Sequence, residues 1–203
     1  MFDRHLINCC APTLASLKSG SLFCCRQTED TCLEGAVDEW NSAFSELGLC
    51  MCILRKKENS ALIYVYRTTS LALTLREPEV QSFLAAYGYE SCSCCEGCEM
   101  PSCSIESCLE HLKRRIAVTA GSESEDDMAF PHEIGVFLGY PLQDVIGFIE
   151  NKGMNSKYTG LWKVYGDRDE SMKMFAKFRK CTDVYGELWR SGRRSIMQLT
   201  VAG

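Results

Sequence analysis

Apolar side chains recur at helical spacing in four segments, residues 33–47, 78–87, 105–116 and 174–188. In each segment the apolar positions step by three or four residues, which places them on one face of a helix. The first segment follows a capping-box pattern at 31–34, where a threonine precedes a glutamate by three positions. The spacing therefore predicts four amphipathic helices that each bury one face.

Runs of β-branched and aromatic residues predict the strands. Residues 50–57 and 61–67 are rich in strand-forming side chains and are separated by a short polar turn, so they predict a β-hairpin. Residues 161–165 and 196–201 have a similar composition and predict two further strands. Strands near both ends of a helical middle favour the α+β class, with a mixed, largely antiparallel sheet of about four strands covered by helices.

The remaining segments complete a single predicted α+β domain over residues 1–203. Two short helices, 131–138 and 142–150, are expected on either side of a glycine-tyrosine-proline turn. Residues 119–129 are small, polar and acidic, which is typical of a flexible, solvated loop. Residues 90–104 hold a cluster of cysteines, and we expect them to form a second loop.

The composition is that of a globular protein, since 46% of the residues are hydrophobic and 24% are charged. The net charge of −5 disfavours a nucleic-acid partner, because proteins that bind a phosphate backbone carry a basic surface. No apolar run reaches the roughly 18 residues that would cross a bilayer, and the first residues do not resemble a secretory signal. We therefore expect a cytoplasmic protein without a membrane partner.

The chain contains 14 cysteines, which a reducing cytoplasm would keep as free thiols rather than as disulfides. Five of them crowd between glycine, serine and proline residues: Cys92, Cys94, Cys95, Cys98 and Cys103. Cys95 and Cys98 form a Cys-x-x-Cys pair, a spacing that brings two thiolates to one tetrahedral ion. The cluster therefore predicts a bound zinc ion or iron–sulfur cluster, although the spacing matches neither common ferredoxin pattern. A cysteine-rich loop that binds metal only adventitiously is the alternative.

A thiol nucleophile is a second hypothesis for the chemistry of this chain. Cys10 would act as the thiolate, His132 as its base, and either Glu133 or Asp144 would orient the imidazole. His132 follows a proline at a predicted helix start, where the helix dipole disfavours the imidazolium form. In the alternative interpretation, His132 and Glu133 only cap that helix and satisfy the free backbone N–H groups of its first turn.

Two basic residues at predicted strand ends, Arg67 and Lys163, are candidate contacts for an anionic cofactor, provided that their strands are neighbours. No glycine-rich phosphate loop accompanies them. A third class of function, a protein-interaction module with neither metal nor reactive thiol, also fits the sequence. The three classes differ in whether the protein binds metal and in whether one thiol is unusually reactive.

Four segments, residues 10–15, 65–67, 130–149 and 161–165, resemble in order an uncharacterised family, a domain of unknown function, from anaerobic Gram-positive bacteria. The long central segment, FPHEIGVFLGYPLQDV followed by GFI, is the most distinctive. The resemblance implies no established activity. It does imply a link to iron or redox metabolism, with a flavodoxin-like redox protein or a small molecule as partner. The cysteine cluster departs from the family pattern, so a metal site there would be particular to this chain.

Overall fold

The structure is a computed structural model that describes residues 2–26, 32–89, 101–121 and 130–202. The chain divides into two compact units. The first unit comprises Met1–Arg67 and Lys173–Gly203, and the second unit comprises Thr68–Met172. Whether these two units form the single domain predicted over residues 1–203 is not tested by this division, and the single domain stays a prediction.

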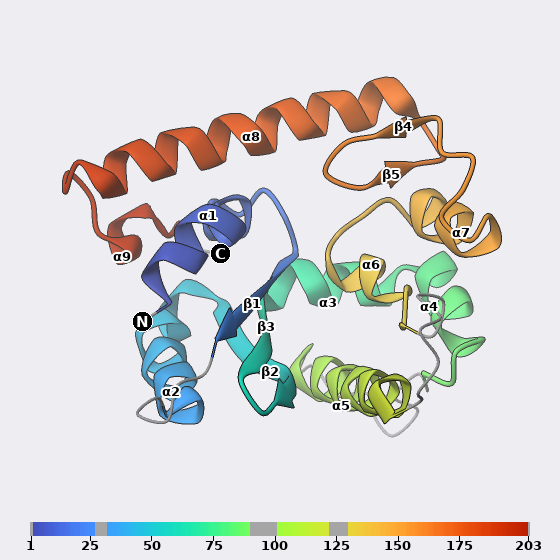
Figure 1. The fold of residues 1–203 in the computed structure, drawn as a ribbon, viewed down its shortest axis with the longest axis horizontal. Coiled ribbons are helices and arrows are strands. Elements are labelled where there is room, and N and C mark those ends of the chain that lie inside the picture. The colour runs from blue at the N-terminus through green and yellow to red at the C-terminus, as the bar shows by residue number, and fades with distance from the viewer. Residues whose placement is uncertain (1, 27–31, 90–100, 122–129, 203) are drawn as a thin grey trace. The chain divides into compact units, whose positions relative to one another are not determined.

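The first unit is built on a three-stranded antiparallel sheet (Figure 1). Its elements are α1 (Asp3–Leu14), β1 (Gly20–Arg26), α2 (Leu33–Phe44), the 3-10 helix η1 (Ser45–Leu47), β2 (Leu49–Lys57), β3 (Ser60–Arg67), most of α8 (Arg168–Arg190), and α9 (Ile196–Leu199). The strand order is β1-β3-β2. β2 and β3 form the hairpin that the sequence predicts, and β1 pairs with the other edge of β3.

One face of this sheet carries the hydrophobic core of the first unit. Alternate strand residues contribute to the core, among them Phe23, Met51 and Ile63. Helices α1 and α2 add buried side chains such as Leu6 and Phe44, and α9 adds two more. Because side chains alternate between the faces of a strand, burying this set of residues fixes the register of all three strands.

The second unit is mainly helical and contains a small two-stranded sheet. Its elements are α3 (Thr68–Arg76), α4 (Pro78–Ala85), α5 (Pro101–Gly121), α6 (Ile134–Phe137), α7 (Leu142–Glu150), β4 (Tyr158–Thr159) and β5 (Lys163–Val164). α3 packs against α4 and α5, α6 packs against α7, and α7 packs against β5. A ladder as short as β4–β5 is not stable alone, so it depends on its packing against α7.

The predicted α+β class is confirmed, with antiparallel pairing between all strands of the described residues. The strands fall into two sheets rather than one. The predicted helices correspond to α2, α4, α5, α6, α7 and α8. The start of α2 differs from the predicted capping box, because Cys32 is the N-cap and its sulfur accepts a hydrogen bond from the N–H of Gly35. Thr31 lies outside the described residues.

The predicted strand at 196–201 is wrong, because this segment begins with the helix α9. A capping box starts the helix: the Ser195 hydroxyl accepts from the N–H of Gln198, and the Gln198 side chain accepts from the N–H of Ser195. These two bonds satisfy backbone N–H groups that the first turn of a helix leaves without a partner. They therefore stabilise residues 196–199 as a helix rather than as a strand. The strand predicted at 161–165 is shortened to Lys163–Val164. The apolar pattern does not predict α1, β1 and α3.

The two longest helices, α5 and α8, have 21 and 23 residues. α5 overlaps both predicted loops, since it begins at Pro101 and ends at Gly121, and residues 90–100 and 122–129 lie outside the described residues. α8 is amphipathic, and its last turns pack against the core of the first unit through Tyr185, Leu188 and Trp189. Within the described parts of the chain, no helix combines the length and the apolarity needed to cross a membrane.

Gly147 lies where α7 meets β5, at a position where the space for a side chain is already filled. A Cβ atom on Gly147 would lie 2.4 Å from the Cβ atom of Tyr165. We therefore expect Gly147→Ala to lower the free energy of unfolding by about 2 kcal/mol, because Tyr165 would have to move. Urea unfolding followed by circular dichroism measures this change.

The matched control is Gly186→Ala in α8. The nearest atom to a Cβ at Gly186 is at the flexible end of Arg190, at 3.3 Å. Alanine favours a helix over glycine by about 1 kcal/mol, so this control should be neutral or stabilising. If Gly147→Ala behaved in the same way, the tight contact between α7 and β5 would be contradicted.

Candidate functional site

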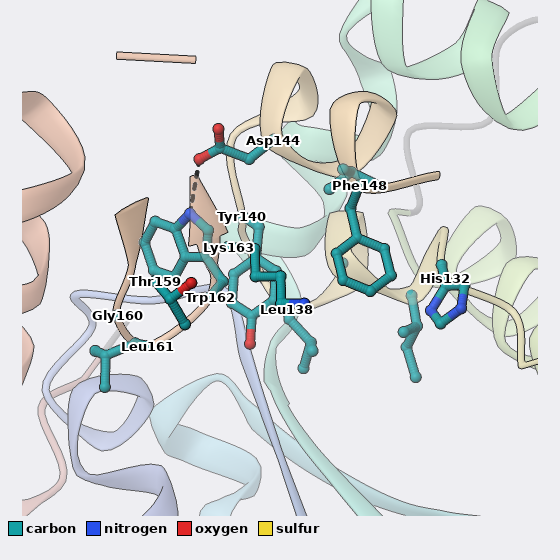
Figure 2. A pocket seen from close by; sticks show the side chains of 13 residues that line it. His132, Leu138, Tyr140, Asp144, Phe148, Thr159, Gly160, Leu161, Trp162 and Lys163 are labelled. Atoms are coloured by element: carbon teal, nitrogen blue, oxygen red, sulfur yellow. Dashed lines mark hydrogen bonds between the residues drawn. The ribbon is translucent and has the colours of Figure 1, made fainter. Parts of the chain in front are cut away.

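The second unit contains a pocket of about 370 Å³ between the helix pair α6–α7 and the β4–β5 hairpin (Figure 2). Its lining comes from two stretches of the chain, residues 132–148 and 159–163. Most of the lining side chains are apolar or aromatic, and Tyr140, Phe148 and Trp162 are the largest rings among them. Pockets of this size and character are typical of sites for small organic molecules.

Two glycines allow the chain to form the wall of the pocket. A Cβ atom on Gly135 would lie 2.7 Å from Cγ2 of Val145, so only a glycine lets α6 approach α7 this closely. The chain then reverses at Gly139, whose φ of 69° lies in the left-handed region. The next residue, Tyr140, lines the pocket, and burial raises the pKa of its hydroxyl, so the phenol is neutral at physiological pH.

Asp144 connects α7 to the β4–β5 hairpin. It is 3% exposed and its carboxylate accepts three hydrogen bonds. Oδ2 accepts from the indole N–H of Trp162 at 2.7 Å, the bond that Figure 2 marks with a dashed line. Oδ1 accepts from the backbone N–H groups of Tyr165 and Gly166, at 2.7 Å each. These donors are needed because burial of an uncompensated carboxylate is costly.

The anchored indole forms a two-ring wall with Tyr140. The ring centroids of Trp162 and Tyr140 are 4.8 Å apart and the ring planes differ by 25°, which is a stacked arrangement. Stacking between offset rings stabilises both orientations beyond the burial of their area. The orientation of Trp162 is therefore determined from two sides, by a hydrogen bond and by a ring contact.

Phe148 is contacted by the two basic side chains of the pocket. The His132 ring meets it edge to face, with centroids 4.8 Å apart. The Lys163 ammonium lies 5.8 Å from the centroid of the same ring and donates to the carbonyl of Gly153 at 2.7 Å. The pocket thus combines aromatic walls with an imidazole and an ammonium group.

Cys10 lies on α1 in the core of the first unit and has no exposed surface. Burial raises the pKa of its thiol, and the neighbouring Cys9 raises this pKa further. The thiol is therefore protonated at neutral pH, whereas an activated nucleophile needs a lowered pKa. His132 and Glu133, its predicted partners, belong to the second unit. The environment of Cys10 is that of a core residue, and its catalytic role stays a prediction.

Glu133 is also buried, and its side chain does not cap α6. Its carboxylate accepts a hydrogen bond from the Tyr89 hydroxyl at 3.2 Å and forms an ion pair with Arg115. Burial raises the pKa of the Tyr89 phenol, and the adjacent carboxylate raises it further. Glu133 therefore connects the start of α6 to α5, a role in packing that neither interpretation of the sequence anticipates.

Arg67 and Lys163 do not lie on neighbouring strands, which was the condition for their predicted joint role. β3, which carries Arg67, pairs with β1 and β2, whereas β5 pairs with β4. The Arg67 guanidinium is 1% exposed and donates to three backbone carbonyls, those of Thr13, Leu14 and Leu47. These bonds leave it inaccessible to an external anion. Lys163, by contrast, lines the pocket.

The predicted metal ligands Cys92, Cys94, Cys95 and Cys98 lie outside the described residues. Cys103 falls within α5 at a position where the side chain is not described. Among the side chains that the structure does describe, no group of three or more His, Cys, Asp or Glu residues could hold a metal ion. The zinc or iron–sulfur site and the flavodoxin-like partner stay predictions.

The aromatic wall of the pocket is the part of the site that sequence reasoning misses. Tyr140, Phe148 and Trp162 belong to a predicted turn, a predicted helix and a predicted strand, and none of them is a candidate site residue in the sequence. A signal was nevertheless present, because all three residues belong to the segments 130–149 and 161–165 that carry the family resemblance. Apart from Thr159 and Gly160, every described lining residue belongs to these segments.

The pocket also falls within the part of the chain, residues 6–200, that matches a family model described as a protein of unknown function, DUF3793. No curated protein and no solved structure matches the chain. The bacterial group and the individual segments named for the resemblance stay predictions. Because the family model covers almost the whole chain, this protein belongs to the DUF3793 family of proteins of unknown function.

Proposed function

We propose that this protein binds a small organic molecule with a planar ring in the pocket between α6–α7 and the β4–β5 hairpin. The observation that supports this best is the aromatic wall, in which Trp162 stacks on Tyr140 and is hydrogen-bonded to Asp144. Aromatic side chains that are held in place before binding lose little conformational entropy when a ring packs against them. A ligand with a planar ring would gain most from such a wall.

Binding is better supported at this pocket than catalysis by a cysteine or serine nucleophile. The described lining contains no cysteine or serine side chain, and the buried Cys10 belongs to the first unit. Asp144 accepts three hydrogen bonds that join α7 to the β4–β5 hairpin, which gives its carboxylate a role in the structure of the pocket. These observations favour a ligand-binding role for the second unit over that of an enzyme with a cysteine or serine nucleophile.

A neutral fluorescent dye, anilinonaphthalene, tests this proposal. The chain has 3 tryptophans, so replacing Trp40 and Trp189 by phenylalanine leaves Trp162 as the sole indole energy donor. We expect saturable energy transfer from Trp162 to the bound dye, because the indole lines the pocket. The measurement is a fluorescence titration with excitation of the indole.

Phe148→Ala removes one ring from the pocket and should weaken dye binding about tenfold, since a lost ring contact costs roughly 1.4 kcal/mol. The matched control is Phe83→Ala in α4. Phe83 is also half-buried and contacts a ring, that of Tyr87, but it does not line the pocket. Equal affinity in the two variants, or the lack of any saturable transfer, would count against the proposal.

A further inference from the structure

Lys163 brings a positive charge to a pocket that is otherwise mainly apolar and aromatic. Its Nζ atom donates to the carbonyl of Gly153 at 2.7 Å. An ammonium group has three N–H donors, and this bond uses one of them. Among the described residues, no carboxylate forms an ion pair with Lys163. The ammonium therefore retains both charge and donors for a bound molecule.

Asp144 is the one carboxylate in the described lining, and its oxygens already accept hydrogen bonds from the protein. It is 3% exposed, and the N–H groups of Trp162, Tyr165 and Gly166 donate to its two oxygens. Since these oxygens serve to hold the β4–β5 hairpin, they have little acceptor capacity left for a ligand. Lys163 is thus the charged side chain of the described lining that keeps hydrogen-bonding capacity for a bound molecule.

A cationic ligand is the main rival, because aromatic pockets often hold cations over their ring faces. In this pocket the Lys163 ammonium already lies near the Phe148 ring, 5.8 Å from its centroid. The Tyr140 and Trp162 rings stack on each other, which covers one face of each. A second cation among these rings would be repelled at short range by Lys163, whereas an anion would be attracted.

We infer that the natural ligand is an aromatic or heteroaromatic acid, whose ring packs against the Trp162–Tyr140 wall and whose anionic group binds the Lys163 ammonium. The inference rests on the proposed function of the pocket and specifies its ligand class. A carboxylate accepts a charge-assisted hydrogen bond from an ammonium, which is stronger than a bond between neutral groups. Together, the ring wall and the ammonium would fix the orientation of the ligand.

The sulfonate of the same dye, anilinonaphthalene sulfonate, tests this inference because it differs from the neutral dye by one anionic group. We expect Lys163→Met to weaken sulfonate binding about tenfold, which is the size of effect that one charge-assisted hydrogen bond gives. The affinity for the neutral dye should fall by a clearly smaller factor in the same variant, because this dye has no anionic group to lose its partner. Lys163→Arg, which keeps the charge, should retain most of the sulfonate affinity. Energy transfer from Trp162 measures these affinities and those of the protein that keeps Lys163.

Lys157→Met is the matched control for the substitution of Lys163. Lys157 precedes β4, and its Nζ atom likewise donates to a backbone carbonyl, that of Gly166, at 2.7 Å. It does not line the pocket. We therefore expect Lys157→Met to leave the affinities for both dyes unchanged, even if it lowers stability as much as Lys163→Met does.

The outcomes separate the inference from the proposal on which it rests. If neither dye binds to the unsubstituted pocket, the proposed function itself fails. If both dyes bind and Lys163→Met changes the two affinities by the same factor, the pocket holds rings but does not select an anion, and the inference is overturned. Preference for a cationic naphthylmethylammonium probe over the sulfonate would overturn it as well.

Discussion

Replacing Arg67 by methionine is expected to lower the free energy of unfolding by roughly 3–5 kcal/mol. The guanidinium is buried and donates to the carbonyls of Thr13 and Leu14, where α1 ends, and to the carbonyl of Leu47 in η1. Bonds from a charged donor contribute more than bonds between neutral groups, and the negative end of a helix dipole favours a cation. Methionine fills much of the same space but donates no hydrogen bond.

Two effects offset part of this loss and are included in the expected value. Removal of the guanidinium relieves the cost of keeping a charge away from water. In addition, the Thr13 carbonyl keeps a bond from the N–H of Ser16, and the Leu14 carbonyl keeps a bond from the N–H of Val201. The remaining loss is still a large share of the stability of an ordinary domain.

Two further variants show whether the loss comes from the three bonds of Arg67. Arg67→Lys should recover little of the stability, because a single ammonium lacks the planar fork that reaches several carbonyls. Arg26→Met, on the exposed end of the neighbouring strand β1, should change the free energy of unfolding by less than about 0.5 kcal/mol. Urea unfolding measures all three variants. A result for Arg67→Met that equals that of Arg26→Met would show that the buried guanidinium does not hold α1 and η1 together.

The periodic elements of the fold are predictable from the sequence because each carries its own local signal. The hairpin of β2 and β3 follows from two β-rich runs around a polar turn, and α2 follows from its apolar spacing. The helix α1 is not predicted, since Pro12 interrupts its pattern and proline is unfavourable inside a helix. Burial compensates for this cost: Leu6, Ile7 and Leu14 of α1 are all fully buried in the core.

The error at the C-terminus has a different cause. The β-rich composition of residues 196–201 predicts a strand, although Ser195 and Gln198 stand at the spacing of a capping box. Composition was a weaker signal than the capping box in this case. A segment with strand propensity forms a strand only beside a partner strand, whereas a capping box forms its hydrogen bonds within the segment itself. A short segment that carries both signals should therefore be assigned by its cap.

The candidate site is only partly predictable, because it depends on contacts between distant segments. His132 and Lys163 are candidates from the sequence, and both line the pocket. Burial, however, is a property of the folded chain: nothing in the sequence around Cys10 or Arg67 indicates that both side chains are closed off from solvent. The stacking of Trp162 on Tyr140 likewise arises only when β5 packs beside α7.

Asp144→Asn is expected to lower the free energy of unfolding by about 2–4 kcal/mol and to weaken dye binding. Asparagine has nearly the shape of aspartate, but it replaces one acceptor oxygen by an NH₂ donor. Since donors converge on both oxygens of Asp144, at least one of them would face another donor in the variant. If the amide turns its NH₂ toward Trp162, the indole loses its anchor and the ring wall becomes mobile.

Asp167→Asn is the matched control, because it makes the same change at an exposed carboxylate. Asp167 Oδ1 accepts from the N–H of Glu170 at 3.0 Å and caps the start of α8, a position where asparagine serves about as well as aspartate. Urea unfolding and the dye titration, both read through Trp162, measure the two variants. Loss of stability with unchanged dye affinity would restrict Asp144 to holding the hairpin. If Asp144→Asn lowered neither the stability nor the dye affinity, the convergence of three donors on the Asp144 carboxylate would be contradicted. The aromatic wall on which the proposed function depends would then be contradicted as well.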